Sequence, residues 1–296
     1  SAWLKRHEPA AFVAALINSQ PMGFYAPSQL VQDARRHGVE VRPVDVDASD
    51  LDCTLEPNES GALALRLGLR LVKGFPEAAA LRLVEARRTT GFDSVQSLAL
   101  RARLDRRELG CLAAAGALTR LAGHRHRAAW QVAGVEAPLP LIDEPQIAEG
   151  IPLLRAPREG QDIVADYRHV GLSLRRHPIE LLRPRLAARS VLSAARLREH
   201  PSGSRVRTAG LVVTRQRPGT ASGVTFVTLE DETGYINLIV WRQIAERQRR
   251  ALVGSRLMGV TGELQLEGEV MHVIVHRITD LSSWLGDLVA PSRDFR

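Results

Sequence analysis

The 296-residue sequence is poor in lysine and cysteine, and each shortage limits the functions open to it. Lys5 and Lys73 are its only lysines, so arginine supplies nearly all of the 40 basic residues. That bias is typical of a GC-rich genome and weakens any argument from charge alone. Cys53 and Cys111 lie far apart and outside any ligand-spaced cluster, which argues against a disulfide framework and a structural zinc site.

Long apolar runs are also missing. No stretch is long enough to span a membrane and none opens the chain as a signal peptide, so we expect no membrane partner and a cytoplasmic location. The chain starts at Ser1 in the middle of an apparent helix and without Met, which leads us to expect a fragment of a longer protein.

The composition that remains is that of a folded protein with a basic surface. The apolar fraction of 45% is ample for packed cores, and the length suggests two or three domains. A net charge of +7 favours a polyanionic partner, and the arginine fork suits phosphate. Most individual arginines still fit the simpler interpretation of solvated helix faces.

The most informative stretch runs from Leu69 to Val84. Apolar residues at helical spacing flank Lys73-Gly74-Phe75-Pro76, which predicts two short amphipathic helices joined by a tight turn. Gly74 can adopt the positive φ of such a turn, and Pro76 fits the first turn of the second helix. The pattern resembles a helix-hairpin-helix motif at every position except one, where Pro76 replaces the second glycine.

A helical hairpin of this kind can bind a DNA phosphate. Amides at the start of the second helix have no intrahelical partner, and the helix dipole places positive charge there. The predicted residues that bind duplex phosphate are Lys73, Gly74, Phe75 and Glu77. Because proline has no N–H, this turn has one donor fewer than the motif. The alternative is an ordinary helical hairpin with a glycine turn.

A second hairpin is expected downstream. Asp93 or Ser94 can cap a helix that holds Val95 and Leu98, and a further helix is expected to begin near Leu104 and end at Gly116.

Three polar clusters call for a simpler interpretation. Asp45, Asp47 and Asp50 are interpreted as a solvated loop and not as a metal site. The basic run 124–127 is interpreted as solvated or phosphate-facing charge, because two histidines at i and i+2 on a helix diverge. His177 before Pro178 has no carboxylate or nucleophile beside it in the sequence, so we expect a structural cap. We therefore predict no catalytic residue and no metal site in this chain.

The hydrophobic period changes from helical to alternating between Ser204 and Leu281. Three strands, a basic helix and two more strands are expected in that order, which is the order of the five-stranded OB-fold barrel. Barrels of this type bind single strands by stacking bases on aromatic rings over a basic groove. The predicted single-strand site consists of Arg215, Arg217, Phe226, Tyr235 and Trp241, although at least one of these rings is expected in the core.

Several segments resemble one protein family. Residues 16–46, the hairpin entry and the segment 166–178 are similar to the distal fingers and following domains of bacterial C-family DNA polymerases. The run from Leu16 to Tyr25 is most similar to the damage-induced, error-prone branch, a relative of the polymerase III alpha subunit. The resemblance covers essentially the whole chain and implies a multidomain α+β protein, mostly helical at first and ending in an OB-fold barrel. The expected domains are a distal fingers segment (1–57), a tandem helix-hairpin-helix (58–122), a linker and helical connector (123–203), the OB-fold (204–284) and a tail (285–296).

The resemblance also implies a function. The parent would be a DNA-directed DNA polymerase for translesion synthesis, with Mg²⁺ held by palm aspartates outside this fragment, and the fragment would grip primer-template duplex and single-stranded template. No glutamine between Leu121 and Arg205 opens a clamp-binding peptide, so contact with the sliding clamp is expected through a Y-family-like adaptor protein. The alternative is a non-catalytic scaffold that docks proteins and binds little DNA. An OB domain from a tRNA-handling enzyme fits less well, because hairpins precede the barrel.

Overall fold

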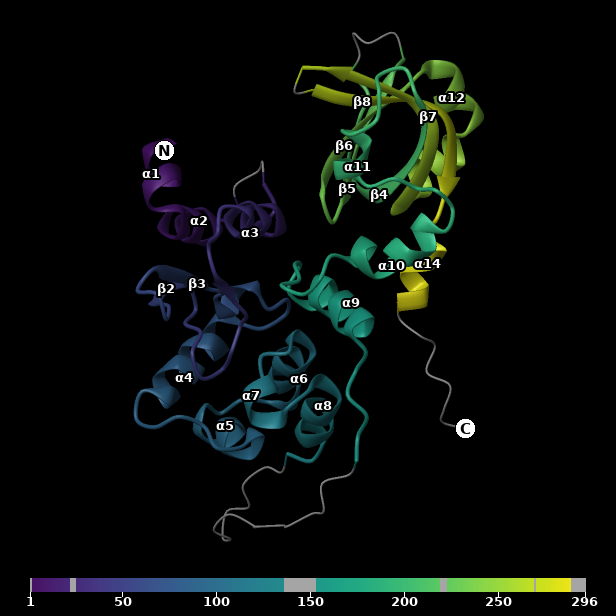
Figure 1. Cartoon of the computed structure of the whole chain (residues 1–296). Helices are drawn as coiled ribbons and strands as arrows, with labels where there is room; N and C mark the ends of the chain where they lie inside the picture. The colour runs from purple at the N-terminus through teal and green to yellow at the C-terminus, as the bar shows by residue number, and fades with distance from the viewer. Residues whose placement is uncertain (1, 22–24, 136–152, 219–222, 269, 289–296) are drawn as a thin grey trace, which may run out of the picture. The chain divides into compact units, whose positions relative to one another are not determined.

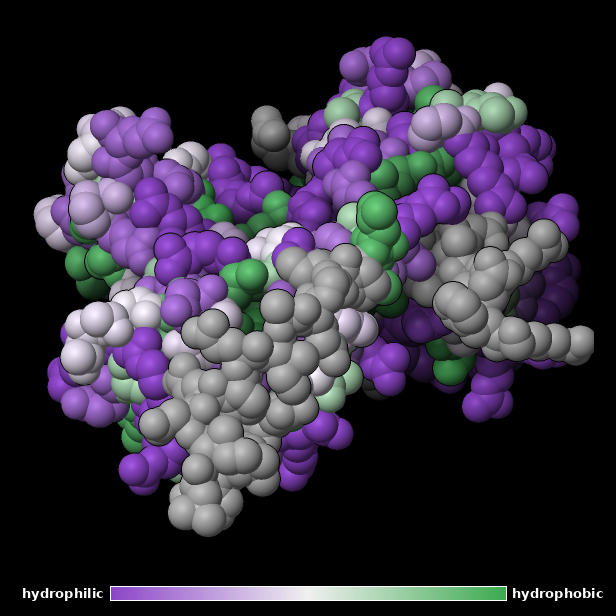
Figure 2. Space-filling view, turned by 90° about the horizontal axis from the view of Figure 1, so that it is seen from below, coloured by the Kyte–Doolittle hydropathy of each residue, from purple (hydrophilic) through white to green (hydrophobic). Residues whose placement is uncertain are grey.

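The computed structural model describes residues 2–21, 25–135, 153–218, 223–268 and 270–288. The chain divides into two compact units, residues 1–174 and 175–296 (Figure 1). Hydrophilic residues cover most of the face visible in Figure 2, where hydrophobic residues form separate patches. No helix of the described ranges combines the length and the apolar character that crossing a membrane requires.

The first unit is mostly helical, with one small sheet. Its helices are α1 (Ala2–His7), α2 (Pro9–Asn18), α3 (Pro27–Arg36), α4 (Glu77–Arg87), α5 (Val95–Arg101), α6 (Arg106–Ala115), α7 (Thr119–Ala122), α8 (Arg125–Ala133) and α9 (Glu159–His169), with a 3₁₀ turn η1 (Leu69–Leu71). Its strands are β1 (Val41–Arg42), β2 (Thr54–Pro57) and β3 (Leu63–Arg66). β3 lies in the middle, parallel to β1 and antiparallel to β2.

One strand of this unit is very short, and one expectation was wrong in detail. Strand β1 contains only Val41 and Arg42, and Pro43, which has no N–H for a ladder, follows directly. The first helix of the hairpin is only the 3₁₀ turn η1, and Pro76 is the residue before α4 and not within it. The amide of Leu69 donates to the Asp50 carbonyl and that of Arg70 to the Leu51 carbonyl, so these residues are tied to the preceding loop.

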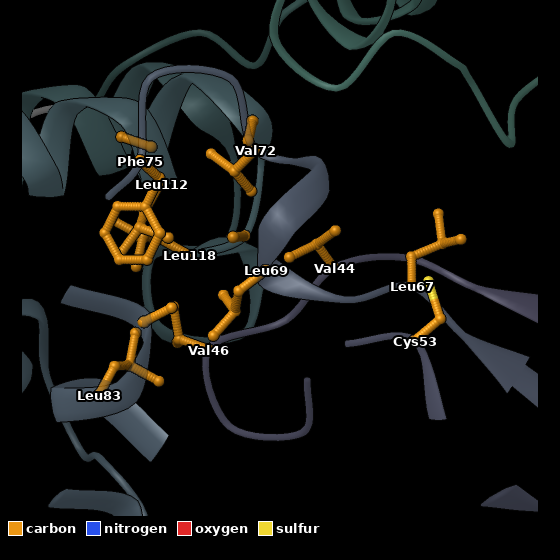
Figure 3. Packing of buried hydrophobic residues seen from close by; sticks show 14 of the residues in the cluster. Val44, Val46, Cys53, Leu67, Leu69, Val72, Phe75, Leu83, Leu112 and Leu118 are labelled. Carbon is orange, nitrogen blue, oxygen red and sulfur yellow. The ribbon is translucent and has the colours of Figure 1, made fainter. Parts of the chain in front are cut away.

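One hydrophobic core extends through the first unit. It contains residues from the predicted fingers segment and from both hairpins, among them Ile17, Val46, Leu69, Leu83 and Leu112. Figure 3 shows part of this cluster, with the ring of Phe75 in the same region as Leu112 and Leu118. The fingers segment and the hairpins therefore fold around shared apolar contacts.

The loop at 45–50 is fixed and not simply solvated. The Asp47 carboxylate, only 7% exposed, pairs with Arg120 at 2.8 Å and accepts the Phe92 amide at 3.1 Å. Asp50 pairs with Arg87 at 2.6 Å. These acidic residues join the fingers segment to the hairpins. In the parts of the chain that are described, no group of three or more His, Cys, Asp or Glu side chains could hold a metal ion.

The second unit is the predicted barrel with flanking helices. Its strands are β4 (Arg205–Gln216), β5 (Thr225–Asp231), β6 (Gly234–Val240), β7 (Leu257–Glu267) and β8 (Val270–Asp280), and its helices are α10 (Pro178–Ala187), α11 (Ala194–Leu197), α12 (Arg242–Arg247), α13 (Arg249–Gly254) and α14 (Ser283–Leu288). The barrel closes in the order β4-β5-β6-β8-β7, with β6 and β8 parallel. The predicted OB-fold is confirmed.

The flanking helices are attached to the barrel by charged and aromatic side chains. Arg183 of α10 forms ion pairs with Asp231 and Glu232 in the turn between β5 and β6. The guanidinium groups of Arg185 and Arg189 lie over the ring of Trp284 in α14, 3.8 and 4.6 Å from the ring centroid. The stretch predicted as a tail thus contains a packed helix over residues 283–288.

The helix predicted over 243–252 is divided into α12 and α13. Gln248 lies at the break, where its side chain accepts the Ile278 amide at 2.8 Å and donates to the His276 carbonyl at 3.3 Å. These bonds to β8 fix the break and hold both helices against the barrel.

Candidate nucleic-acid interface

The hairpin turn has the backbone that the sequence predicted. Gly74 has a φ of +79°, and α4 begins three residues later at Glu77. Lys73, Gly74 and Glu77 are exposed, whereas Phe75 is buried and belongs to the core. Phe75 therefore positions the turn through its buried ring, and only its backbone is available to a phosphate. The Glu77 carboxylate lies in the first turn of α4, where it competes with an incoming anion for the dipole.

Lys73 is engaged by helix α9. Its amide donates to the His169 carbonyl at 2.8 Å and its ammonium to the Tyr167 carbonyl at 3.1 Å. A lysine here satisfies the free carbonyls at the end of a helix and complements the negative end of the dipole. Burial, together with the charges of Arg168, Arg125 and Lys73, lowers the pKa of His169. The predicted phosphate ligand thus has a structural role of its own.

The basic run at 124–127 also proves to be largely structural. The side chain of Arg125 is only 11% exposed, and it donates to the carbonyls of Ala114 and Ala115 and pairs with Asp162 and Asp166 of α9. The His124 side chain caps α8 by accepting the Arg127 amide at 3.2 Å. The expectation of solvated or phosphate-facing charge was therefore wrong for Arg125, whose guanidinium holds α9 on the hairpin domain.

The second hairpin carries a basic turn that the sequence reading passed over. Ser94 caps α5 as predicted, and Asp105 caps α6 in a reciprocal pair with Glu108. Between them Arg103 adopts a φ of +51°, the left-handed position that Gly74 occupies in the first hairpin. Arg103, Arg106 and Arg107 are exposed around this turn. In the sequence, Arg103-Leu104 follows Gly74-Phe75 by 29 residues, and this spacing could have indicated a second turn of the same kind.

The barrel exposes aromatic rings on its outer face. Phe226 of β5 is 39% exposed, and Trp241, which directly follows β6, is 53% exposed. Their buried neighbours Val227 and Val240 point inward, as strand alternation requires. Tyr235 is half-buried and lies opposite Glu230 at the other end of the same strand pair. The three predicted rings are thus spread along the outside of β5 and β6, with two of them exposed.

Strand register adds residues to this face that sequence reasoning missed. Phe226 is paired with Ile239, and Thr228 with Asn237 through a 3.3 Å side-chain hydrogen bond. The parallel neighbour β8 places His272 beside Asn237 and Ile274 beside Ile239. Only the register of β6 against β8, which are far apart in sequence, brings these side chains together. We name Phe226, Asn237, Ile239, Trp241, His272 and Ile274 the outer barrel face.

The two predicted arginines differ in their roles. Arg215 lies within β4 and donates through Nε to the Leu252 carbonyl at 2.7 Å and through Nη2 to the Ser255 carbonyl. Burial lowers the pKa of Arg215. Arg217 follows the strand and is exposed. Arg215 is therefore fixed to the end of α13, whereas Arg217 can reach a ligand.

His177 acts as the predicted cap. It precedes α10, and its Nδ1 accepts the Ile179 amide at 3.2 Å, with Pro178 in the first turn.

Two family profiles match the chain. One is described as "Helix-hairpin-helix motif" and covers residues 38–128, and the other is described as "OB-fold nucleic acid binding domain" and covers residues 206–281. The chain is 58% identical over its whole length to the "Error-prone DNA polymerase" of Methylococcus capsulatus and 59% identical to that of an Azoarcus species. It spans 30% and 28% of those two relatives.

A solved structure of asparaginyl-tRNA synthetase from Pyrococcus horikoshii covers 27% of this chain and 20% of its own at 24% identity, with a TM-score of 0.24, which is too low to carry an argument. The resemblance to error-prone DNA polymerases that the sequence motifs indicated is confirmed along the entire chain.

Proposed function

We propose that this chain is the DNA-handling part of an error-prone DNA polymerase that acts in translesion synthesis. The supporting relatives carry that polymerase name, and the chain spans less than a third of each. Nucleotidyl transfer with Mg²⁺ would be carried out by the remainder of the parent protein. Among the described residues, no group of three or more His, Cys, Asp or Glu side chains could hold a metal ion.

The observation that carries the proposal is the outer barrel face. Two exposed rings, Phe226 and Trp241, lie on strands of a barrel whose family description is nucleic-acid binding. Aromatic rings on such strands stack with unpaired bases in a sequence-tolerant way. Arg217 is exposed just beyond β4, next to the strand that carries Phe226, and adds positive charge for the backbone. Single-stranded template is the ligand that fits this combination.

Duplex binding is assigned to the hairpin unit. The turn at Gly74 presents backbone amides at the start of α4, and Lys73 places a charge beside them. Arg103 and Arg107 at the second turn extend the basic surface. Contacts of this kind are made to phosphates and are independent of sequence.

The test is fluorescence anisotropy of the 296-residue chain with duplex, primer-template and single-stranded DNA, from low to physiological salt. Single-strand binding should weaken in a Phe226→Ala/Trp241→Ala variant, and duplex binding should weaken in a Lys73→Glu variant. Each affinity should fall with salt, because phosphate contacts release counterions. Failure to bind any DNA at low salt would favour a protein-docking scaffold instead.

Access to the sliding clamp is proposed to run through a Y-family-like adaptor. Of the three glutamines in the connector, Gln131 lies within α8 and Gln161 within α9, where its side chain accepts the Arg158 amide at 2.8 Å. Gln146 lies outside the described residues. Both glutamines lie in helices, so either helix would have to unfold before its glutamine could begin an extended clamp-binding peptide. Direct clamp binding by this chain at micromolar concentration would refute the adaptor proposal.

A further inference from the structure

A pocket of about 430 Å³ lies in the second unit, between the end of β4, the start of β5 and helices α12 and α13. Among the described residues that line it, four are arginines and one is an acid. Four positive charges against one negative leave a net charge of +3 around the opening. The charged lining residues are Arg215, Arg217, Arg242, Arg249 and Glu246.

Part of this charge is already fixed in place. Arg215 is held by two carbonyls at the end of α13, and Arg242 pairs with Glu246 at 2.8 Å. Arg242, and less strongly Arg217, lowers the pKa of the Glu246 carboxyl. The only lining acid is thus neutralised by its own neighbours, and the pocket remains positive.

The pocket also has an apolar side. Ala245 of α12 and Leu252 and Val253 of α13 line it, and Val253 is 64% exposed. Arg249 and Val253 are four residues apart on α13, so they share one face of the helix. Arg249 is exposed and makes no hydrogen bond or ion pair within the described ranges. An exposed aliphatic side chain beside an unpaired guanidinium is complementary to a ligand that is both apolar and acidic.

We propose that this pocket binds an acidic peptide segment of a partner protein, with an apolar side chain of the peptide on Leu252 and Val253 and its carboxylates on Arg217 and Arg249. Guanidinium groups bind carboxylates through paired hydrogen bonds, and burying an apolar side chain adds affinity. Single-stranded DNA fits less well. Its bases need aromatic rings for stacking, and the described lining residues include no aromatic ring, because Phe226 and Trp241 lie outside the pocket.

The experiment uses the whole chain and a fluorescein-labelled peptide, Gly-Ser-Glu-Asp-Leu-Phe-Asp-Glu, followed by anisotropy. A second peptide, with serine in place of leucine and phenylalanine, tests the apolar contact. Arg249→Glu should weaken binding about tenfold or more, because it replaces a charge-assisted contact by repulsion. Val253→Ser should weaken binding of the first peptide and leave that of the second unchanged.

Arg250→Glu is the matched control, since Arg250 is also an exposed arginine of α13 but does not line the pocket. It carries the same change of net charge and should alter the Kd by less than about twofold. The proposal is overturned if neither peptide binds, or if Arg249→Glu and Arg250→Glu weaken binding equally. It is also overturned if two results occur together: oligo-dT displaces the peptide, and Arg249→Glu weakens oligo-dT binding more than it weakens peptide binding. The pocket would then be part of the nucleic-acid binding surface.

Discussion

The two units use similar residue types for opposite purposes. In the hairpin unit the aromatic residue of the turn, Phe75, is buried, and Lys73 beside it is hydrogen-bonded to carbonyls at the end of α9. In the barrel unit Phe226 and Trp241 are exposed on the outer face, and Arg217 is exposed nearby. A basic residue next to an aromatic one therefore stabilises the fold in the first unit, whereas in the second unit it forms a surface that a ligand can reach.

The difference follows from how each unit makes its core. The barrel fills its interior with the inward residues of five strands, so the alternate residues must face outward whatever their type. The hairpin domain has short helices and a single 3₁₀ turn, and its core includes the ring of Phe75 and Leu172, which follows α9. Four measurements test this difference between the two units.

The largest effect is expected at Arg125, the largely covered arginine that holds α9. Arg125→Ala removes the guanidinium from Asp162 and Asp166, whose side chains are only 11% and 15% exposed. We expect the free energy of unfolding of the first unit to fall by about 3–5 kcal/mol in a urea titration. Arg183→Ala in the barrel unit should cost less, because the side chain of Arg183 is 22% exposed.

Arg88→Ala serves as the control for both arginines. Its pair with Glu85 joins side chains that are 75% and 71% exposed, so the loss should be about 0–0.5 kcal/mol. If Arg125→Ala lowers the free energy of unfolding no more than Arg88→Ala does, the ion pairs of Arg125 do not hold α9 on the hairpin domain. The basic residues of the first unit would then not be mainly structural, and the difference between the two units would disappear.

The next effect concerns the outer barrel face. Phe226→Ala and Trp241→Ala should each weaken oligo-dT binding by about 1–3 kcal/mol, or about 5- to 150-fold in Kd, by removing a stacking surface. Anisotropy titration measures the change, and Leu81→Ala is the control. Leu81 is 53% exposed but lies on α4 of the other unit. Equal losses in all three variants would contradict a dedicated single-strand face.

A smaller effect separates the two roles of Lys73. Lys73→Gln should lower the slope of log Kd against log salt for duplex by about one if the ammonium also contacts a phosphate. Because the substitution weakens a charged donor to the Tyr167 carbonyl, it should also destabilise the end of α9 by about 1 kcal/mol, visible as faster amide exchange at 170–174. Faster exchange with an unchanged salt slope would make Lys73 purely structural, and Arg107→Gln would then be the substitution that lowers the slope.

The smallest effect is a pH dependence confined to the first unit. Arg66, and secondarily Arg42, hold the pKa of Glu56 below its ordinary value of 4.5. A carboxyl whose pKa is lowered by folding stabilises the protein above its unfolded pKa, and this contribution is lost as the pH falls through the folded value. In thermal melts Glu56→Gln should therefore lower the Tm near pH 7 and flatten its decline below about pH 4.5. A parallel decline in both proteins would remove Glu56 from the acid response.

Local patterns were sufficient for much of the fold. Alternation and turn residues gave the five strands of the barrel within about three residues at each end, because one face of each strand must be apolar. Ser94, one of two candidate caps, and the helix end at Gly116 were identifiable, since each acts on backbone within a few residues of itself. The break at Gln248 could not be predicted, because its cause is hydrogen bonding to β8, about 30 residues away.

The order of elements, the glycine turn at Gly74 and the polymerase resemblance could be predicted without a structure, because they depend on residues close together in the chain. Which charges remain available depends on contacts between distant segments. Arg125 and Arg215 look like surface cations in the sequence, yet one is paired with Asp162 and Asp166 and the other is fixed to two carbonyls. The reason is physical: a guanidinium has five donors, and a partner 37 to 41 residues away satisfies them as well as a phosphate can.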